Sequence, residues 1–305
     1  MINMVIDKLI EQIKKKKNPC IVGIDPEWDK IPGCYKNKTI SEVETILQWA
    51  TDVIDVVSDI VPAVKPQMAF FEVFGAEGVK VYQQIIQYAH DKGLLVVDDS
   101  KRNDIGNTAR AYAYAHLDKN GPINADFMTV SPFLGTDSLQ PFIEISVRDG
   151  KGLFILVKTS NPSSVEISEA TNMQGERICD WLANYVNTVG KTCVGKNGYS
   201  AIGAVVGATF PVKAKQLREK MRNNFFLVPG FGAQGGRVKD IDFCFNEDGL
   251  GAIVSSSRGV LYKYLEVGEF DNTRAMYREI VRKEVMDMQM AVYEELKSTC
   301  RNMQY

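Results

Sequence analysis

LLVVDDSKRNDIGNTARAYA, residues 94–113, begins as a continuous apolar run and continues as a helical pattern. Leucine and valine fill the apolar part, as in parallel strands that are buried on both faces. The run ends in a group of charged residues, after which the pattern reads as the start of a helix. A buried strand followed directly by a helix is the repeating unit of α/β proteins.

The same unit recurs along the chain. Seven more apolar runs, each ending in polar or glycine-rich residues, lie at 20–26, 61–71, 127–133, 152–161, 202–209, 225–236 and 251–259. Helical patterns lie at 41–60, 78–93, 136–152, 175–191, 211–223 and 272–299. Eight strands alternating with helices predict a (β/α)8 TIM barrel. The alternative is an open doubly wound sheet, but no GxGxxG follows the first run. We expect one α/β domain over 1–305, with an N-terminal helix and a long C-terminal helix.

Composition argues against several classes of function. The formal net charge is −2 with acids and bases mixed, so no nucleic-acid partner is expected. No stretch approaches the ~18 apolar residues of a membrane span, and the first residues read as an amphipathic helix rather than a signal peptide. Six cysteines without a CxxC pair indicate reduced thiols in a cytoplasmic protein. We expect His90 and His116 to be structural, with His116 beyond the helix that follows the charged stretch.

Polar residues stand at the C-terminal ends of the predicted strands, where barrel enzymes carry their active sites. They are Asp25, Lys65, Asp99, Lys101, Ser131, Ser160, Asn161, Thr209, Gln234 and Arg258. Such a ring predicts a small-molecule pocket. The glycine-rich segment 229–236 and Arg258 follow the last two strands and favour a phosphate site, although a glycine turn and a surface arginine are the simpler alternative.

The charged stretch itself indicates a reactive centre. Asp99 and Lys101 share one face of the strand and Asp98 takes the other, so we expect the first two at the barrel mouth and Asp98 towards the helices. With Lys65 and Asp104 they would form an alternating array in which two acids keep Lys101 protonated. Such an ammonium can protonate a carbon or stabilise a carbanion. The alternative is a purely structural role, because ion pairs that only stabilise the fold can have the same spacing. An Asp such as Asp104 is also favourable at a helix start without any catalytic role.

Six stretches resemble the orotidine 5′-phosphate decarboxylase family, in the family's order and over nearly the whole chain. They are GIDP (23–26), VKPQMAFFE (64–72), DxKxxDIGNT (99–108), VKTSNP (157–162), VPGFGAQGG (228–236) and SSSRG (255–259). The length and the VKPQ form are similar to the longer, type 2 branch. The resemblance implies conversion of orotidine 5′-phosphate (OMP) to UMP in pyrimidine synthesis, without a cofactor or a metal.

The resemblance also implies a role for each matching residue. Lys101 would stabilise and protonate the C6 carbanion, and Asp99 would lie against the substrate carboxylate. Lys65 would contact the ribose and belong to the charged array. Asp104 and Thr108 would reach the neighbouring active site of a homodimer. The other substrate-binding residues would be Asp25 at a ribose hydroxyl, Ser160 at the pyrimidine, Gln234 between base and phosphate, and Gly235, Gly236 and Arg258 at the phosphate.

The sequence leaves the roles of two residues and one alternative function open. Some relatives carry Asn where this chain has Gln67, so Gln67 is left out of the catalytic set, and the role of Asp98 is undecided. A magnesium-dependent sugar-phosphate decarboxylase or aldolase on the same barrel is the main alternative. Ser160 and Gln234, which suit a pyrimidine edge, argue against it. A non-catalytic sensor of a phosphorylated ligand would not need two acids around a lysine.

Overall fold

Eight parallel strands form a closed barrel in the computed structural model, which describes residues 4–230, 239 and 241–305. Each strand pairs with the next one along the chain, and β8 pairs with β1, which distinguishes the barrel from an open sheet. The strands are β1 (Cys20–Ile24), β2 (Ala63–Pro66), β3 (Leu95–Arg102), β4 (Phe127–Val130), β5 (Gly152–Lys158), β6 (Ser200–Val206), β7 (Asn224–Val228) and β8 (Ala252–Ser256). The predicted (β/α)8 fold is therefore confirmed.

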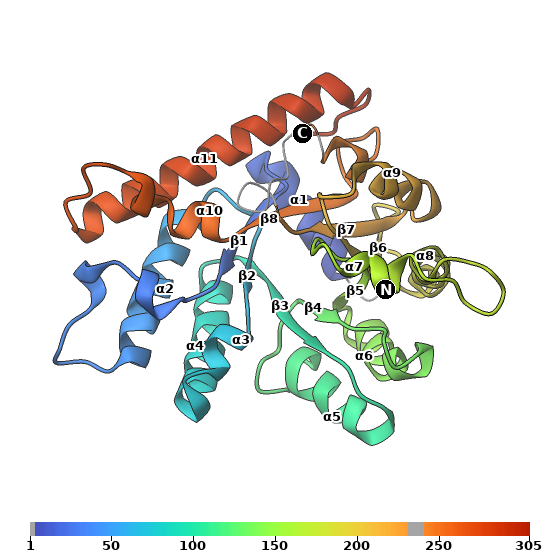
Figure 1. Ribbon diagram of the computed structural model, residues 1–305, viewed down its shortest axis with the longest axis horizontal. Helices are drawn as coiled ribbons and strands as arrows, with labels where there is room; N and C mark the ends of the chain where they lie inside the picture. Colours follow the sequence, from blue (N-terminus) through green and yellow to red (C-terminus); the bar gives the residue numbers. More distant parts are fainter. Residues whose placement is uncertain (1–3, 231–238, 240) are drawn as a thin grey trace.

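Helices surround the strands (Figure 1). They are α1 (Val5–Lys16), α2 (Glu42–Val57), α3 (Ala69–Glu72), α4 (Gly75–Asp91), α5 (Gly106–Leu117), α6 (Gln140–Asp149), α7 (Ser164–Ser168), α8 (Ile178–Gly190), α9 (Pro211–Lys220), α10 (Arg258–Leu261) and α11 (Arg274–Thr299). The expected N-terminal helix is α1, and the expected long C-terminal helix is α11. None of the helices in the described part of the chain has the length and apolar character needed to cross a membrane.

Local sequence signals explain several helix boundaries. Ser41 and Glu44 form a capping box at the start of α2. Pro211 occupies the first turn of α9, where its missing N–H removes no helical hydrogen bond. The start of α3 has no such signal. It lies inside the apolar run 61–71, of which only the first part is a strand, and α3 begins at Ala69. A short apolar run does not distinguish a strand from a buried helical turn.

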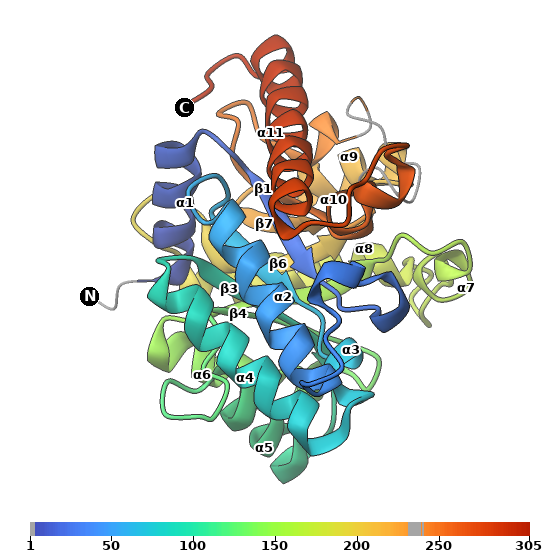
Figure 2. The same cartoon turned by 90° about the vertical axis from the view of Figure 1, so that its left-hand side faces the viewer.

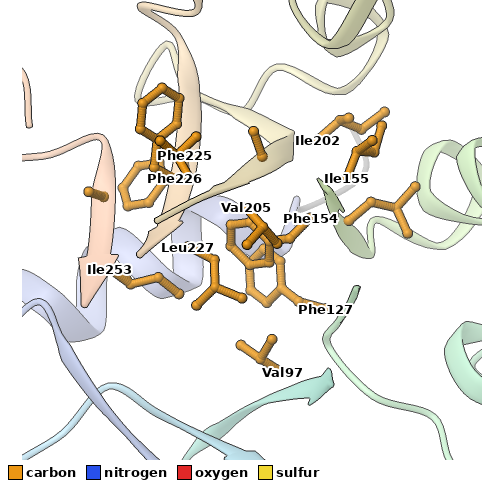
Figure 3. Packing of buried hydrophobic residues seen from close by; sticks show 14 of the residues in the cluster. Val97, Phe127, Phe154, Ile155, Ile202, Val205, Phe225, Phe226, Leu227 and Ile253 are labelled. Carbon is orange, nitrogen blue, oxygen red and sulfur yellow. The ribbon is translucent and has the colours of Figure 1, made fainter. Parts of the chain in front are cut away.

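The barrel interior is filled by large side chains from several strands (Figure 3). The rings of Phe127 and Phe154 stack with their centroids 5.3 Å apart. Val205 and Leu227 lie beside them in the same view, and all four side chains are almost completely buried. A Cβ on Gly152 would come within 2.2 Å of the Phe127 ring, so only glycine fits there. This packed centre places any ligand site at the ends of the barrel.

The N-terminal end of the barrel is covered by α1 and by the last residues of the chain. The carboxylate of Asp7 in α1 accepts hydrogen bonds from the backbone N–H groups of Lys196 (2.9 Å) and Asn197 (3.0 Å), just before β6. The Tyr305 hydroxyl donates to the carbonyl of Gly249 (2.8 Å), just before β8. Figure 2 shows α1 and the C-terminal end of the chain on one side of the molecule. The C-terminal ends of the strands, with their polar residues, face the other way.

Candidate active site

Three charged side chains meet at the C-terminal ends of β2 and β3. Nζ of Lys65 lies 2.7 Å from Oδ2 of Asp99, and Nζ of Lys101 lies 2.5 Å from Oδ1 of the same carboxylate. The side chains of Lys65 and Asp99 are 7% and 9% exposed, whereas that of Lys101 is 43% exposed. Asp99 therefore joins one buried ammonium group to one that reaches the barrel mouth, as the two-residue spacing predicts.

The electrostatics of this cluster keep Asp99 and Lys65 charged. Burial alone would raise the pKa of Asp99, but the ammonium groups of Lys65 and Lys101 together lower that pKa well below its usual range. Burial likewise opposes the charge of Lys65, yet the carboxylates of Asp99 and Asp25 outweigh it and raise the pKa of Lys65. The site therefore holds fixed charges near neutral pH.

Two uncharged side chains also bind the Asp99 carboxylate. Nε2 of Gln67 donates to Oδ2 (3.1 Å), and the hydroxyl of Thr129 in β4 donates to Oδ1 (2.9 Å). The catalytic set predicted from the sequence contains neither Gln67 nor Thr129. The available signal was a hydroxyl within the otherwise apolar strand FMTV, at a position where an apolar residue would be expected.

Asp98 points away from this cluster, towards the surrounding helices, as parity predicts. Its carboxylate is completely buried, accepts a hydrogen bond from the Tyr82 hydroxyl of α4, and lies 2.6 Å from Nδ1 of His116. His116 lies in the last turn of α5 and not beyond the helix, so that part of the prediction is wrong. Its structural role, expected from the sequence, agrees with its burial. The three residues attach the back of β3 to two helices.

A cavity of about 620 Å³ opens at this end of the barrel, within the size range of small-molecule sites. Its lining includes Asp25, Glu27, Lys65, Gln67, Asp99, Lys101, Ser160, Asn161, Gly230 and Arg258. Six of the residues to which the resemblance gives a role therefore surround one space. A larger hollow of about 870 Å³, near Arg218 and Asp248, contains none of the predicted site residues.

Asp25 offers an acceptor to this cavity. Burial raises its pKa, and the nearby ammonium of Lys65 acts in the opposite direction. Its Oδ1 is buried and has no hydrogen-bond partner among the residues that the structure describes. A buried acceptor without a partner is costly, so a ligand hydroxyl placed here would form a favourable bond.

The segment after β5 is held against the cavity by several contacts. Gly207, after β6, permits a close approach, because a Cβ there would lie 2.8 Å from Cα of Ser160. The Thr209 hydroxyl donates to the carbonyl of Ser160 (3.0 Å). Lys158 is buried and its ammonium donates to the hydroxyls of Ser164 (3.1 Å) and Ser168 (2.7 Å), the first and last residues of α7. These contacts fix the strand end that carries Ser160.

Ser131 and Thr209, which were predicted for the ring of polar residues, do not line this cavity, and neither do Asp104 and Thr108. Asp104 is half-buried, and its Oδ1 accepts a hydrogen bond from the backbone N–H of Ile105 (2.8 Å). Thr108 is exposed in the first turns of α5. Within one chain, therefore, three members of the predicted four-residue array meet and Asp104 stands apart from them.

Arg258 is exposed at the start of α10 and lines the cavity, as expected for a phosphate ligand. The other predicted phosphate-side residues, Gln234, Gly235 and Gly236, lie outside the described residues. In the described ranges no group of three or more His, Cys, Asp or Glu residues has the arrangement to bind a metal ion.

Comparison with known proteins identifies the family. A model of the "Orotidine 5'-phosphate decarboxylase / HUMPS family" matches residues 18–266. The chain belongs to this family. An orotidine 5′-phosphate decarboxylase of Clostridium perfringens is 36% identical over 293 residues, which cover 96% of this chain and 99% of that protein. Another, of Caldicellulosiruptor bescii, is 40% identical over 286 residues, which cover 89% of this chain and 93% of that protein.

Solved structures agree with this assignment to the orotidine 5′-phosphate decarboxylase / HUMPS family. The OMP decarboxylase of Leishmania donovani matches with a TM-score of 0.70 at 29% sequence identity, covering 94% of this chain and 99% of that chain. The resemblance inferred from the six stretches is therefore confirmed at the level of family and fold.

Proposed function

We propose that this chain is a carboxy-lyase that converts OMP to UMP in pyrimidine biosynthesis. The observation that carries the proposal is the Lys65–Asp99–Lys101 cluster, which lines the cavity of a barrel whose relatives bear the name of this decarboxylase. The geometry supports a reaction in which negative charge appears on a carbon beside an ammonium group.

The reaction needs one bond to break and one proton to move. The bond between C6 and the carboxylate of OMP breaks, carbon dioxide leaves, and the electron pair stays on C6. No adjacent carbonyl can take up that charge by resonance, so its stabilisation is electrostatic. The Lys101 ammonium, already oriented by Asp99 at 2.5 Å, supplies this stabilisation without having to reorganise. It then gives one proton to C6 to form UMP, and the neutral amine regains a proton from water.

Asp99 raises the free energy of the bound substrate relative to that of the transition state. Because its pKa is low, it stays ionised when the substrate carboxylate lies beside it. The two carboxylates repel each other in the bound substrate, and this repulsion falls as the departing group becomes neutral carbon dioxide. An interaction that is less unfavourable in the transition state than in the ground state lowers the barrier.

The remaining lining residues would hold the nucleotide in place. We assign the buried Oδ1 of Asp25 to a ribose hydroxyl and Ser160 to the amide edge of the pyrimidine. Arg258, with Gln234, Gly235 and Gly236, would bind the phosphate. Contacts to the phosphate, far from C6, provide binding energy that can be used to orient the reacting ring.

A homodimer with shared active sites would explain where Asp104 and Thr108 lie. Both are outside the cavity of their own chain, and exposed apolar side chains lie in the same strand-end loops, namely Ile105, Phe133 and Leu134. A partner subunit packed on this rim would cover the apolar surface and receive Asp104 beside its Lys101. Mixing Asp104→Ala with Lys101→Ala protein tests this, because only a shared site can regain activity from two inactive variants.

The magnesium-dependent alternative predicts a different dependence on metal. It would require metal ligands at the barrel mouth, and the curated relatives described above carry the decarboxylase name instead. Treatment with EDTA should abolish turnover by such an enzyme and leave OMP decarboxylation unchanged. A single domain over 1–305 and a cytoplasmic location remain our predictions from the sequence.

The decisive experiment follows the loss of OMP absorbance. Wild-type protein should consume OMP, Lys101→Ala should lose nearly all turnover, and Lys283→Ala should be unaffected. Lys283 is a suitable control because its ion pair with Asp287 lies on the surface of α11. No consumption by the wild type would refute the activity, and near-normal turnover by Lys101→Ala would refute the proton-donor role.

A further inference from the structure

The hydroxyl of Thr129 contacts both residues that we assign to the chemical step. It donates to Oδ1 of Asp99 at 2.9 Å and accepts the backbone N–H of Lys101 at 3.0 Å. A hydroxyl has one proton and two acceptor lone pairs, so it can form both bonds at once. Thr129 is completely buried and is absent from the cavity lining, so it does not touch the substrate.

The backbone around Lys101 needs such a partner. Lys101 has φ of +48°, a left-handed conformation that is unfavourable for a residue with a Cβ. The pairing of β3 with β4 is also irregular, because Asp98 pairs with Met128 and Arg102 with Val130. Three residues of β3 therefore stand opposite Thr129 alone. In this bulge the Thr129 side chain accepts the Lys101 N–H in place of a backbone carbonyl.

We propose that Thr129 is a positioning residue for OMP decarboxylation. Its hydroxyl holds the left-handed turn of the chain at Lys101 and the orientation of Asp99, and so directs the ammonium of Lys101 towards C6. The inference rests on the proposed function, since it takes Lys101 and Asp99 as the reacting groups. Displacements on the scale of an ångström at such groups are enough to reduce the rate by about 100-fold.

The test compares two substitutions that differ in the hydroxyl. Thr129→Val keeps the shape of the side chain and removes the hydroxyl, whereas Thr129→Ser keeps the hydroxyl. We expect kcat to fall about 10- to 100-fold in Thr129→Val, with KM for OMP and the affinity for UMP close to the wild-type values. Thr129→Ser should retain most of the wild-type kcat.

The matched control is Thr45→Val. Thr45 is buried in α2 and is absent from the cavity lining, and its hydroxyl has no hydrogen-bond partner among the described residues. The same chemical change there should leave kcat unchanged. A double variant adds a second criterion: in an Asp99→Asn background, Thr129→Val should have a smaller effect on kcat than in the wild type, because the two residues act through one hydrogen bond.

The outcomes separate this inference from the proposed function. Wild-type protein that does not consume OMP refutes the function, whatever Thr129 does. Active wild type with equal kcat in Thr129→Val and Thr129→Ser overturns the positioning role, as does a rise in KM with kcat unchanged. If Thr129→Val does not fold, Thr129→Ala against Thr129→Ser decides: a 10- to 100-fold lower kcat in the alanine variant supports the role, and equal kcat overturns it.

Discussion

Asp99→Asn should destabilise the protein strongly and in a pH-dependent way. The substitution keeps the size of the side chain but removes the charge that faces Lys65 at 2.7 Å, in a place where both side chains are less than a tenth exposed. Lys65 would then be a buried cation that has lost its nearest anion. Breaking a buried ion pair costs about 3–5 kcal/mol, whereas the half-exposed contact with Lys101 should add no more than about 1 kcal/mol.

The direction of the pH dependence follows from the pKa of Lys65. In the wild type this pKa is raised, so the pair stabilises the fold below the unfolded lysine pKa of about 10.4, and the effect is lost as pH rises through the folded value. In the variant, burial without Asp99 should lower the pKa of Lys65. The destabilisation is then complete only below that lowered pKa and disappears above about 10.4. The difference between the two proteins should therefore be largest near pH 7 and narrow towards pH 10.

Urea unfolding at pH 7 and pH 10 measures both effects, with Asp59→Asn as the control. Asp59 is 60% exposed and its carboxylate lies 2.8 Å from Arg282, which does not titrate in this range. Neutralising Asp59 should cost at most about 1 kcal/mol at either pH. Two results would refute the assignment of Lys65 and Asp99 as a desolvated pair. One is an equal loss of unfolding free energy in the Asp99 and Asp59 variants at pH 7. The other is a difference in unfolding free energy between wild type and Asp99→Asn that does not become smaller at pH 10.

Three further substitutions test other parts of the structure. Arg258→Ala should raise KM for OMP about 10- to 100-fold, because the phosphate loses a charge-assisted hydrogen bond. The melting temperature should change little, and a large fall in melting temperature would instead favour a structural role. Asp98→Ala should cost about 2–5 kcal/mol, because Tyr82 and His116 lose a buried partner, and an unchanged urea midpoint would contradict this. Phe154→Ala should cost about 3–5 kcal/mol in the same assay, since it removes half of the stacked pair in the barrel interior; a loss under about 1 kcal/mol would mean that the pair is not tightly packed.

The sequence predicts the barrel well because the signals for it are local. Parallel strands that are buried on both faces are continuous apolar runs, and each of the eight strands lies within or overlaps one of the predicted runs. The predicted run 61–71 is longer than the strand it contains, because residues 69–71 are as apolar as a strand but belong to α3. Composition alone does not separate these two cases.

The charged cluster was predictable for a similar reason, and its supporting residues were not. Asp99 and Lys101 are two apart on one strand, and a lysine side chain is long enough to reach its neighbour even where the strand is irregular. The contacts of Thr129 with Asp99 and Lys101 depend on the register between β3 and β4, which includes a bulge that the sequence pattern does not predict. His116 reaches Asp98 only because α5 packs on that side of β3. The roles that we propose for Asp104 and Thr108 require a second subunit, and the sequence of one chain does not place such a subunit.

The placement of α1 and of the C-terminal tail has a practical consequence for handling this protein. The helix that begins at Val5 and the tail that ends at Tyr305 lie against the loops before β6 and β8, at the N-terminal end of the barrel strands. An affinity tag, a fluorescent label or a tether to a sensor chip can therefore be attached at either terminus without standing in the path of an incoming nucleotide. Immobilised in this way, the molecule would present its open mouth to the solution.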